Sequence, residues 1–264
     1  MKMTAQMLAD KTLLNTVNDY LNQRVAWQLI ASKGTTNRLY RGQISNQSLI
    51  LRANAGEDWA FGVSRETEAQ ILELIQGCVW APKVVKNNWR EGWCLMWDHG
   101  DTIAPPINKK TTSQLLMAIS EWQLIQPRNI QPFDYSALFN RYQKHIDAAT
   151  DHSTQQQQQL DQIINRINKL PAVPQCLTHH DLHIDNICSN DSNVVILDWE
   201  YAGFGNPLFD GAALFKKFKF TAIEISTLPA FSQINRTELK QAFAEVSVVA
   251  TLLEKLWLSI RGQP

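Results

Sequence analysis

Hydrophobic positions recur at helical intervals at the start of the chain and then alternate with polar ones in short runs. Leu8, Leu14, Val17 and Leu21 fall roughly on one helical face, which predicts a leading helix over residues 4–22. The runs that follow are rich in β-branched and aromatic residues and predict an antiparallel sheet. These runs span residues 25–32, 37–44, 47–53, 83–89 and 93–98.

A helical pattern interrupts these strands and then dominates the rest of the chain. One helix is predicted over residues 64–76, with Ser64 as its cap and Gly77 as its stop. Further helices are predicted at 111–125, 134–150, 155–169 and about 236–260. The glycine and paired prolines of HGDTIAPP break regular structure between the two patterns. We therefore predict an α+β protein with a sheet-bearing lobe at 1–98, a linker at 99–106 and a mostly helical lobe at 107–264.

Composition and charge narrow the classes of partner. The 264 residues are 44% hydrophobic, enough for one large core or two smaller ones. Lys+Arg and Asp+Glu both count 25, so the basic excess typical of nucleic-acid and membrane-surface binding is absent from the sequence. No run of about 18 apolar residues suggests a membrane span, and the start lacks a signal-like apolar run. The four cysteines show no paired spacing and are expected to be reduced thiols. We expect a cytoplasmic protein that acts on small molecules, with its oligomeric state left open.

One stretch concentrates polar side chains that suit chemistry. His179, Asp181 and Asn186 lie in a predicted loop, and Asp198 follows the strand-like run VVIL. Phosphoryl transfer to an alcohol needs a carboxylate that orients and deprotonates the hydroxyl, and oxygen ligands that hold Mg²⁺ against the nucleotide phosphates. Asp181 and Asn186 are close enough in the loop for one to face the substrate while the other reaches the metal ion. Asp198 would add an anionic ligand.

Two other interpretations of this stretch remain open at this point. His179, His180 and His183 beside Asp181 could form the metal cluster of a hydrolase, because imidazole and carboxylate together bind transition metals. Alternatively, His180 and His183 are ordinary polar loop residues, and Asp198 is a strand-end aspartate that caps a turn.

Three linked motifs give the stretch a family resemblance. They are HHDLHIDN at 179–186, LDWEYAG at 197–203 and NPLFD at 206–210. Together they resemble the aminoglycoside phosphotransferase and choline kinase superfamily, which shares the two-lobed fold of protein kinases. The resemblance implies an enzyme that uses ATP and Mg²⁺ and transfers a phosphoryl group to a hydroxyl of a small-molecule alcohol.

The resemblance also assigns roles within these motifs. Asp181 would be the catalytic base, and His179 would support the backbone of its loop. Asn186 and Asp198 would bind Mg²⁺. Asp210 would brace the loop from the following helix.

In the N-terminal half the same resemblance implies a nucleotide site. A loop at 31–40, with Gly34, Thr35, Thr36 and Asn37, would cover the phosphates, although an ordinary hairpin turn is the alternative and the G-x-G-x-x-G pattern of protein kinases is absent. Arg52 would bind the α- and β-phosphates in place of the usual lysine. Glu68, with Glu66 as the rival, would pair with Arg52. Backbone groups near Met96 and Trp97 would contact adenine.

The same motifs bear on the phosphate acceptor. LDWEYAG and Arg52 look more like the choline, ethanolamine and thiamine kinases than the aminoglycoside enzymes, which predicts a small cationic alcohol. Glu200, Tyr201 and Trp257 are candidate substrate residues, with Trp257 alternatively a core residue. The competing functions are an aminoglycoside or other sugar phosphotransferase and a catalytically silent nucleotide-binding module.

Overall fold

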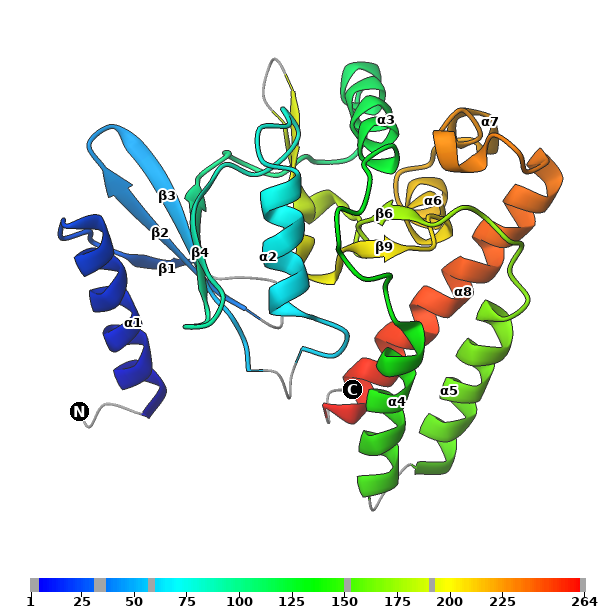
Figure 1. The fold of residues 1–264 in the computed structure, drawn as a ribbon, viewed down its shortest axis with the longest axis horizontal. Coiled ribbons are helices and arrows are strands. Elements are labelled where there is room, and N and C mark those ends of the chain that lie inside the picture. The colour runs from blue at the N-terminus through cyan, green and yellow to red at the C-terminus, as the bar shows by residue number, and fades with distance from the viewer. Residues whose placement is uncertain (1–4, 31–36, 57–59, 150–152, 190–192, 262–264) are drawn as a thin grey trace. The chain divides into compact units, whose positions relative to one another are not determined.

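The computed structural model contains two compact units, and Figure 1 shows the order of their elements. It describes residues 5–30, 37–56, 60–149, 153–189 and 193–261. The first unit comprises Met1–Ala60 and Pro82–His99, and the second unit comprises Phe61–Ala81 and Gly100–Pro264. The predicted α+β class, with an antiparallel sheet toward the N-terminus and a helical C-terminal part, is confirmed.

A five-stranded antiparallel sheet forms the centre of the first unit. Its strand order is β1-β2-β3-β5-β4. The strands are β1 (Gln28–Ile30), β2 (Arg38–Ile44), β3 (Gln47–Ala53), β4 (Val84–Asn88) and β5 (Trp93–Trp97). Each lies inside a run that the alternation of hydrophobic and polar residues predicts.

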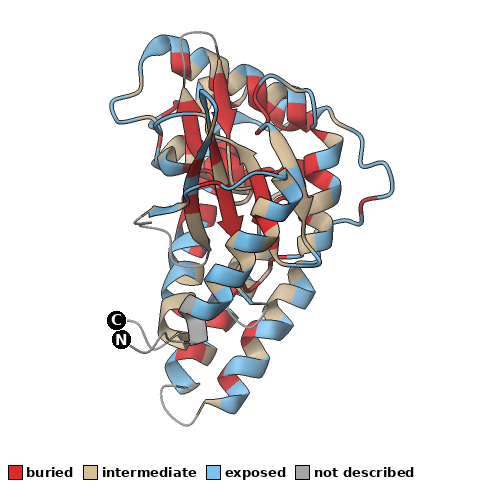
Figure 2. Cartoon of the chain, turned by 90° about the vertical axis from the view of Figure 1, so that its left-hand side faces the viewer, coloured by how far each residue is buried: buried red, intermediate tan, exposed pale blue. Residues whose placement is uncertain are grey.

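The core of the first unit lies between this sheet and helix α1 (Ala5–Leu21). Leu49 and Leu51 of β3 are two residues apart and therefore point to the same face of the sheet. They are buried together with Leu95 of β5 and Val17 of α1. Figure 2 colours each residue by its burial, and the buried residues of this sheet lie mainly on β3 and β5.

Helix α2 (Arg65–Leu74) belongs to the second unit, whereas the sequence prediction placed it in the first lobe. Its cap is as predicted, because the Ser64 side chain accepts a hydrogen bond from the Thr67 backbone N–H. Its buried residues are Glu68, Ile71 and Leu72, and the helix contacts elements from the C-terminal part of the chain. Tertiary contacts of this kind, which the local sequence pattern does not encode, decide the unit to which a helix belongs.

The second unit is mostly helical. Its longer helices are α3 (Lys109–Gln123), α4 (Tyr135–Ala148), α5 (Ser153–Ile167), α6 (Leu208–Lys216) and α8 (Arg236–Ile260), and α7 (Ala222–Ile225) is a single turn. Helices α4, α5 and α8 share a core that includes Ile146, Ile163 and Val249. None of the described helices combines the length and the apolar character that a bilayer span requires.

Two small antiparallel sheets lie between these helices in the chain. Strands β6 and β9 form one sheet, and β7 and β8 form the other. The strands are β6 (Cys176–Thr178), β7 (Ile187–Ser189), β8 (Val194–Ile196) and β9 (Gly203–Gly205), and the 3-10 turns are η2 (Ile184–Asn186), η3 (Trp199–Tyr201) and η4 (Pro229–Phe231). These short elements carry the polar motifs of the sequence.

The contact between α6 and α8 makes a sharp test of the packing. A Cβ added at Gly211 of α6 would lie 2.4 Å from Phe243 Cε1 and 3.0 Å from Phe231 Cζ. We therefore expect Gly211→Ala to lower the free energy of unfolding by about 1–3 kcal/mol through overpacking, although alanine is about 1 kcal/mol better than glycine within a helix. Urea denaturation measures the change.

Gly56→Ala is the matched control, because a Cβ there would meet nothing within 4 Å. A Gly211→Ala variant as stable as Gly56→Ala would contradict the close packing of α6 against α8.

Candidate active site

The candidate site is built on the second unit, at the ends of its short strands. The 179–186 loop follows β6 and runs through η2 into β7, and Asp198 lies shortly after β8. The backbone N–H of Leu197 donates to the carbonyl of Asn186 at 2.8 Å. This hydrogen bond extends the pairing of β7 with β8 and joins the end of the loop to the residue before Asp198.

His179 is fully buried and connects two backbone segments. Its Nε2 lies 2.9 Å from the carbonyl of Leu197, and its Nδ1 lies 3.3 Å from the backbone nitrogen of Asp181. A carbonyl only accepts and a backbone N–H only donates, so the ring is neutral with its proton on Nε2. Burial agrees with this state, because it lowers the pKa of His179 to about 4.

His180 is held in a left-handed backbone conformation, with φ of 64°. Its Nδ1 donates to the carbonyl of Tyr201 at 3.1 Å, and its Nε2 accepts from the Tyr135 hydroxyl at 2.7 Å. Desolvation between Phe133 and Phe209 lowers the pKa of His180 to about 3. His180 is therefore a neutral structural connector, whereas the sequence suggested either a metal-cluster ligand or a polar loop residue.

These contacts argue against the metal-hydrolase interpretation. Both ring nitrogens of His179 and of His180 are occupied by protein hydrogen bonds, so neither imidazole has a lone pair to offer a metal ion. Within the described residues no group of three or more His, Cys, Asp or Glu side chains is arranged to hold a metal.

The Asp210 side chain of α6 binds the start of the loop through two hydrogen bonds. Its Oδ2 accepts the backbone N–H of His179 at 2.8 Å, and its Oδ1 accepts that of His180 at 3.0 Å. Burial raises the pKa of Asp210 to about 7, and the two N–H donors act in the opposite direction. The carboxylate thus fixes two successive peptide groups directly before Asp181.

Asp181 and Asn186 are joined across the loop. Asn186 Nδ2 donates to the carbonyl of Asp181 at 3.0 Å and lies 3.4 Å from its Oδ2. The Asp181 side chain is 37% exposed, and its Oδ2 is 3.4 Å from His183 Nε2. Burial alone would raise the pKa of Asp181, but the hydrogen bond and charge of His183 outweigh it and hold that pKa below its usual value. Asp181 is therefore an ionised carboxylate at neutral pH.

Asp198 adopts the left-handed conformation, with φ of 59° and ψ of 63°. For residues other than glycine this conformation costs roughly 1–2 kcal/mol, with Asn and Asp among those that visit it. The following residue anchors the turn, because the Trp199 indole donates to the carbonyl of Ile196 at 2.8 Å and packs against Trp80 and Trp122.

Asn186 and Asp198 carry oxygen atoms of the kind that Mg²⁺ prefers. The Asn186 amide nitrogen is used within the loop, which leaves its carbonyl oxygen as an acceptor. Magnesium prefers oxygen ligands of this kind together with carboxylates. The donor set therefore suits Mg²⁺ better than a transition metal.

Glu200 has a partner that sequence reasoning missed. Arg65 Nη1 lies 2.7 Å from Glu200 Oε2 and 3.0 Å from Glu68 Oε2. The sequence prediction pairs Glu68 with Arg52 and gives Glu200 to a cationic substrate, and Arg65 is a further partner of both carboxylates. In the structure both carboxylates are buried against Arg65, so a cationic acceptor would have to compete with that arginine for Glu200.

The residues predicted to bind the nucleotide lie mainly in the first unit. Arg52 is buried on β3, and its Nε donates to Asn54 Oδ1 at 3.0 Å. Met96 and Trp97 are half-buried on β5. Asn37 Oδ1 accepts the backbone N–H of Ala55 at 3.0 Å, whereas Gly34, Thr35 and Thr36 lie outside the described residues.

The two aromatic substrate candidates occupy different surroundings. Tyr201 ends η3 and is half-buried, with its carbonyl engaged by His180. Trp257 packs partly buried against the core of α4, α5 and α8, and the Arg261 guanidinium lies 4.3 Å from the centre of its ring. This environment favours the core interpretation of Trp257.

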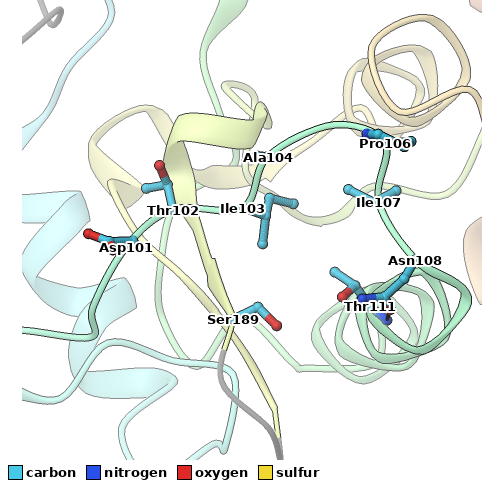
Figure 3. Close-up of a pocket in the computed structure, with 9 residues that line it drawn as sticks. All are labelled: Asp101, Thr102, Ile103, Ala104, Pro106, Ile107, Asn108, Thr111 and Ser189. Carbon is cyan, nitrogen blue, oxygen red and sulfur yellow. Dashed lines mark hydrogen bonds between the residues drawn. The ribbon is translucent and has the colours of Figure 1, made fainter.

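A separate cavity of about 260 Å³ lies within the second unit. Figure 3 shows that residues of the segment 101–108 line it, together with Thr111 of α3 and Ser189 of β7. The Ile103 backbone N–H donates to the carbonyl of Ile187 at 2.8 Å, which attaches this segment to β7. None of the side chains predicted to act on substrate or metal lines this cavity.

The neutral state of His179 predicts a pH dependence of stability. Unfolded histidine binds a proton below about pH 6.5, whereas folded His179 binds one only near its lowered pKa of about 4. Between these pH values the unfolded state binds more protons than the folded state. Acidification therefore lowers the free energy of unfolding by about 1.4 kcal/mol per pH unit for this residue.

His179→Gln keeps an N–H donor for Leu197 but cannot be protonated. We expect it to be less stable than the wild type at pH 7, with a gap that narrows as the pH falls from 6.5 to 4.5. Urea denaturation at several pH values tests this, and a gap of constant size would contradict the neutral buried imidazole.

Comparison with known proteins places this geometry in a family. The model of the phosphotransferase enzyme family (APH) matches residues 27–241. No curated protein sequence matches the chain at a significant level.

Several solved structures share the fold. The choline kinase LicA from Streptococcus pneumoniae is 16% identical, with a TM-score of 0.73 over 97% of this chain and 92% of LicA. LicA in complex with AMP is 17% identical, with a TM-score of 0.70 over 96% of this chain and 91% of that chain. A macrolide 2'-phosphotransferase type I is 14% identical, with a TM-score of 0.68 over 100% of this chain and 95% of that chain. Because the family match covers most of its length, the chain belongs to the phosphotransferase enzyme family and is a phosphotransferase with an alcohol group as acceptor.

Proposed function

We propose that this chain transfers the γ-phosphate of ATP to a hydroxyl of a small cationic alcohol of the choline, ethanolamine or thiamine type. The observation that carries the proposal is the 179–186 loop, which holds an ionised, partly exposed Asp181 beside Asn186. A cytoplasmic location, where ATP is present and thiols stay reduced, belongs to the same proposal.

Asp181 would orient the acceptor hydroxyl and accept its proton. Its lowered pKa makes it a weak base, so most of the rate must come from alignment of the hydroxyl with the phosphorus atom. Phosphoryl transfer tolerates such a base, because its loose transition state places little demand on early deprotonation. His179 would act by holding the backbone of Asp181.

Asn186 and Asp198 would hold Mg²⁺, which neutralises charge on the phosphates when it is bound. On the nucleotide side, Arg52 would contact the phosphates, with the loop of Gly34, Thr35, Thr36 and Asn37, while backbone groups near Met96 and Trp97 would contact adenine. The AMP complex of LicA supports nucleotide binding by this fold.

The cationic acceptor rests on the LDWEYAG motif, on Arg52 and on the half-buried Tyr201 near the loop. A desolvated cation needs a carboxylate or an aromatic face to offset its lost hydration, and Asp181 and Tyr201 supply one of each. The alternative is a sugar or antibiotic acceptor, which the likeness to a macrolide 2'-phosphotransferase favours.

A substrate screen tests the proposal directly. Purified protein with Mg²⁺ and ATP should release ADP with choline, ethanolamine or thiamine, and much less with aminoglycosides, macrolides or neutral sugars. Turnover confined to the antibiotics or sugars would refute the cationic acceptor and leave the kinase. ATP binding without turnover on any alcohol would indicate a catalytically silent nucleotide-binding module.

Substitution of Asp181 tests the catalytic assignment. Asp181→Asn should lower kcat by about 10²–10⁴, the usual effect of losing a positioned acid or base, and leave ATP binding nearly unchanged. Asp185→Asn is the control, because that carboxylate lies in the same loop with 63% of its side chain exposed. Equal kcat values for the two variants would remove Asp181 from the catalytic role.

A further inference from the structure

A buried ion cluster links α2 to the turn that follows Asp198. The guanidinium of Arg65, the first residue of α2, contacts Glu200 at 2.7 Å and Glu68 at 3.0 Å. The side chains of Arg65, Glu68 and Glu200 are 10%, 1% and 3% exposed. An arginine side chain is always protonated in proteins and carries five N–H donors, so Arg65 can hold both carboxylates in place.

Glu200 is the central residue of η3 and lies two residues after Asp198. The turn is therefore fixed at two adjacent points. Trp199 enters the core, where its indole donates to Ile196 and contacts Trp80 and Trp122. Glu200 points to a different element and pairs with α2.

This two-sided attachment bears on Asp198 because its backbone is left-handed. A strained conformation of this kind persists only where the surroundings over-determine it. The tryptophan contact alone fixes the position of residue 199. The pair between Arg65 and Glu200 adds a second attachment, which would restrain the rotation of the turn and hence the direction in which the Asp198 carboxylate leaves the backbone.

We propose that Arg65 is a positioning residue for the metal ligand Asp198, acting through Glu200 from the start of α2. This inference rests on the proposed function, because it takes Asp198 as a ligand of Mg²⁺. Arg65 itself touches neither metal nor substrate in this role. Glu200, which the sequence suggested as a contact for the acceptor, instead belongs to the support of the metal site.

The test separates orientation from simple stabilisation. Loss of an outer-shell partner typically weakens metal affinity roughly 10–100-fold. Arg65→Gln should therefore raise the Mg²⁺ concentration that half-saturates AMP-PNP binding, measured by calorimetry, by roughly tenfold or more. Arg65→Lys keeps the charge but loses the planar fork, so it should lie between Arg65→Gln and the wild type.

Controls keep the result interpretable. Arg166→Gln removes an arginine from an exposed ion pair with Glu245 in the same unit and should leave the Mg²⁺ requirement unchanged. If Arg65→Gln is poorly folded, Glu200→Gln and the Arg65→Met/Glu200→Gln double variant, which leaves neither of these two charges, should show the same raised Mg²⁺ requirement.

The outcomes distinguish the inference from the proposed function. Lowered thermal stability of the Arg65 and Glu200 variants with an unchanged Mg²⁺ requirement would overturn the positioning role and leave the kinase intact. A wild type that binds AMP-PNP with Mg²⁺ but phosphorylates no alcohol would refute the proposed function, while a raised Mg²⁺ requirement in the variants would still support the role of Arg65.

Discussion

The carboxylate of Asp210 accepts the backbone N–H groups of His179 and His180, and the arrangement of the loop depends on this pair of hydrogen bonds. A buried carboxylate without donors would be costly, so the two amides are held where they can reach it. They fix the peptide groups on both sides of His179. The left-handed His180 then turns the chain toward Asp181. The positions of the residues in the candidate site therefore depend on a turn that α6 supports.

The degree of burial separates the polar side chains of the loop into those with a structural role and one that is available for chemistry. The His179 and His180 rings are deprived of water and stay neutral, so each can donate with one nitrogen and accept with the other. Asp181 keeps access to solvent and stays ionised. The histidines therefore connect backbone segments, and the partly exposed carboxylate of Asp181 is the one that the proposed function directs at the substrate.

Strong local periodicity made much of the fold predictable. Strand β3 and helix α8 were predicted at their observed bounds, because their hydrophobic positions repeat over several turns or alternations. Strands of three residues such as β6 and β9 carry no such repeat, and they form by pairing across a long stretch of chain. Arg65 was missed for the same reason, since its partner Glu200 is 135 residues away and leaves no local signature.

The candidate site was readable from sequence only where motif spacing fixes neighbours, as in the loop of Asp181 and Asn186. The acceptor was not, because choline kinases and a macrolide phosphotransferase share this fold. With Glu200 engaged by Arg65, the proposed function has Asp181 serving both the hydroxyl and a nearby cation. A choline-like acceptor would allow one carboxylate to serve both groups, because only a short carbon link separates its hydroxyl from its nitrogen. An aminoglycoside carries several ammonium groups over a larger surface and would call for further acidic side chains, so the pairing of Glu200 with Arg65 is one ground for proposing the smaller cation.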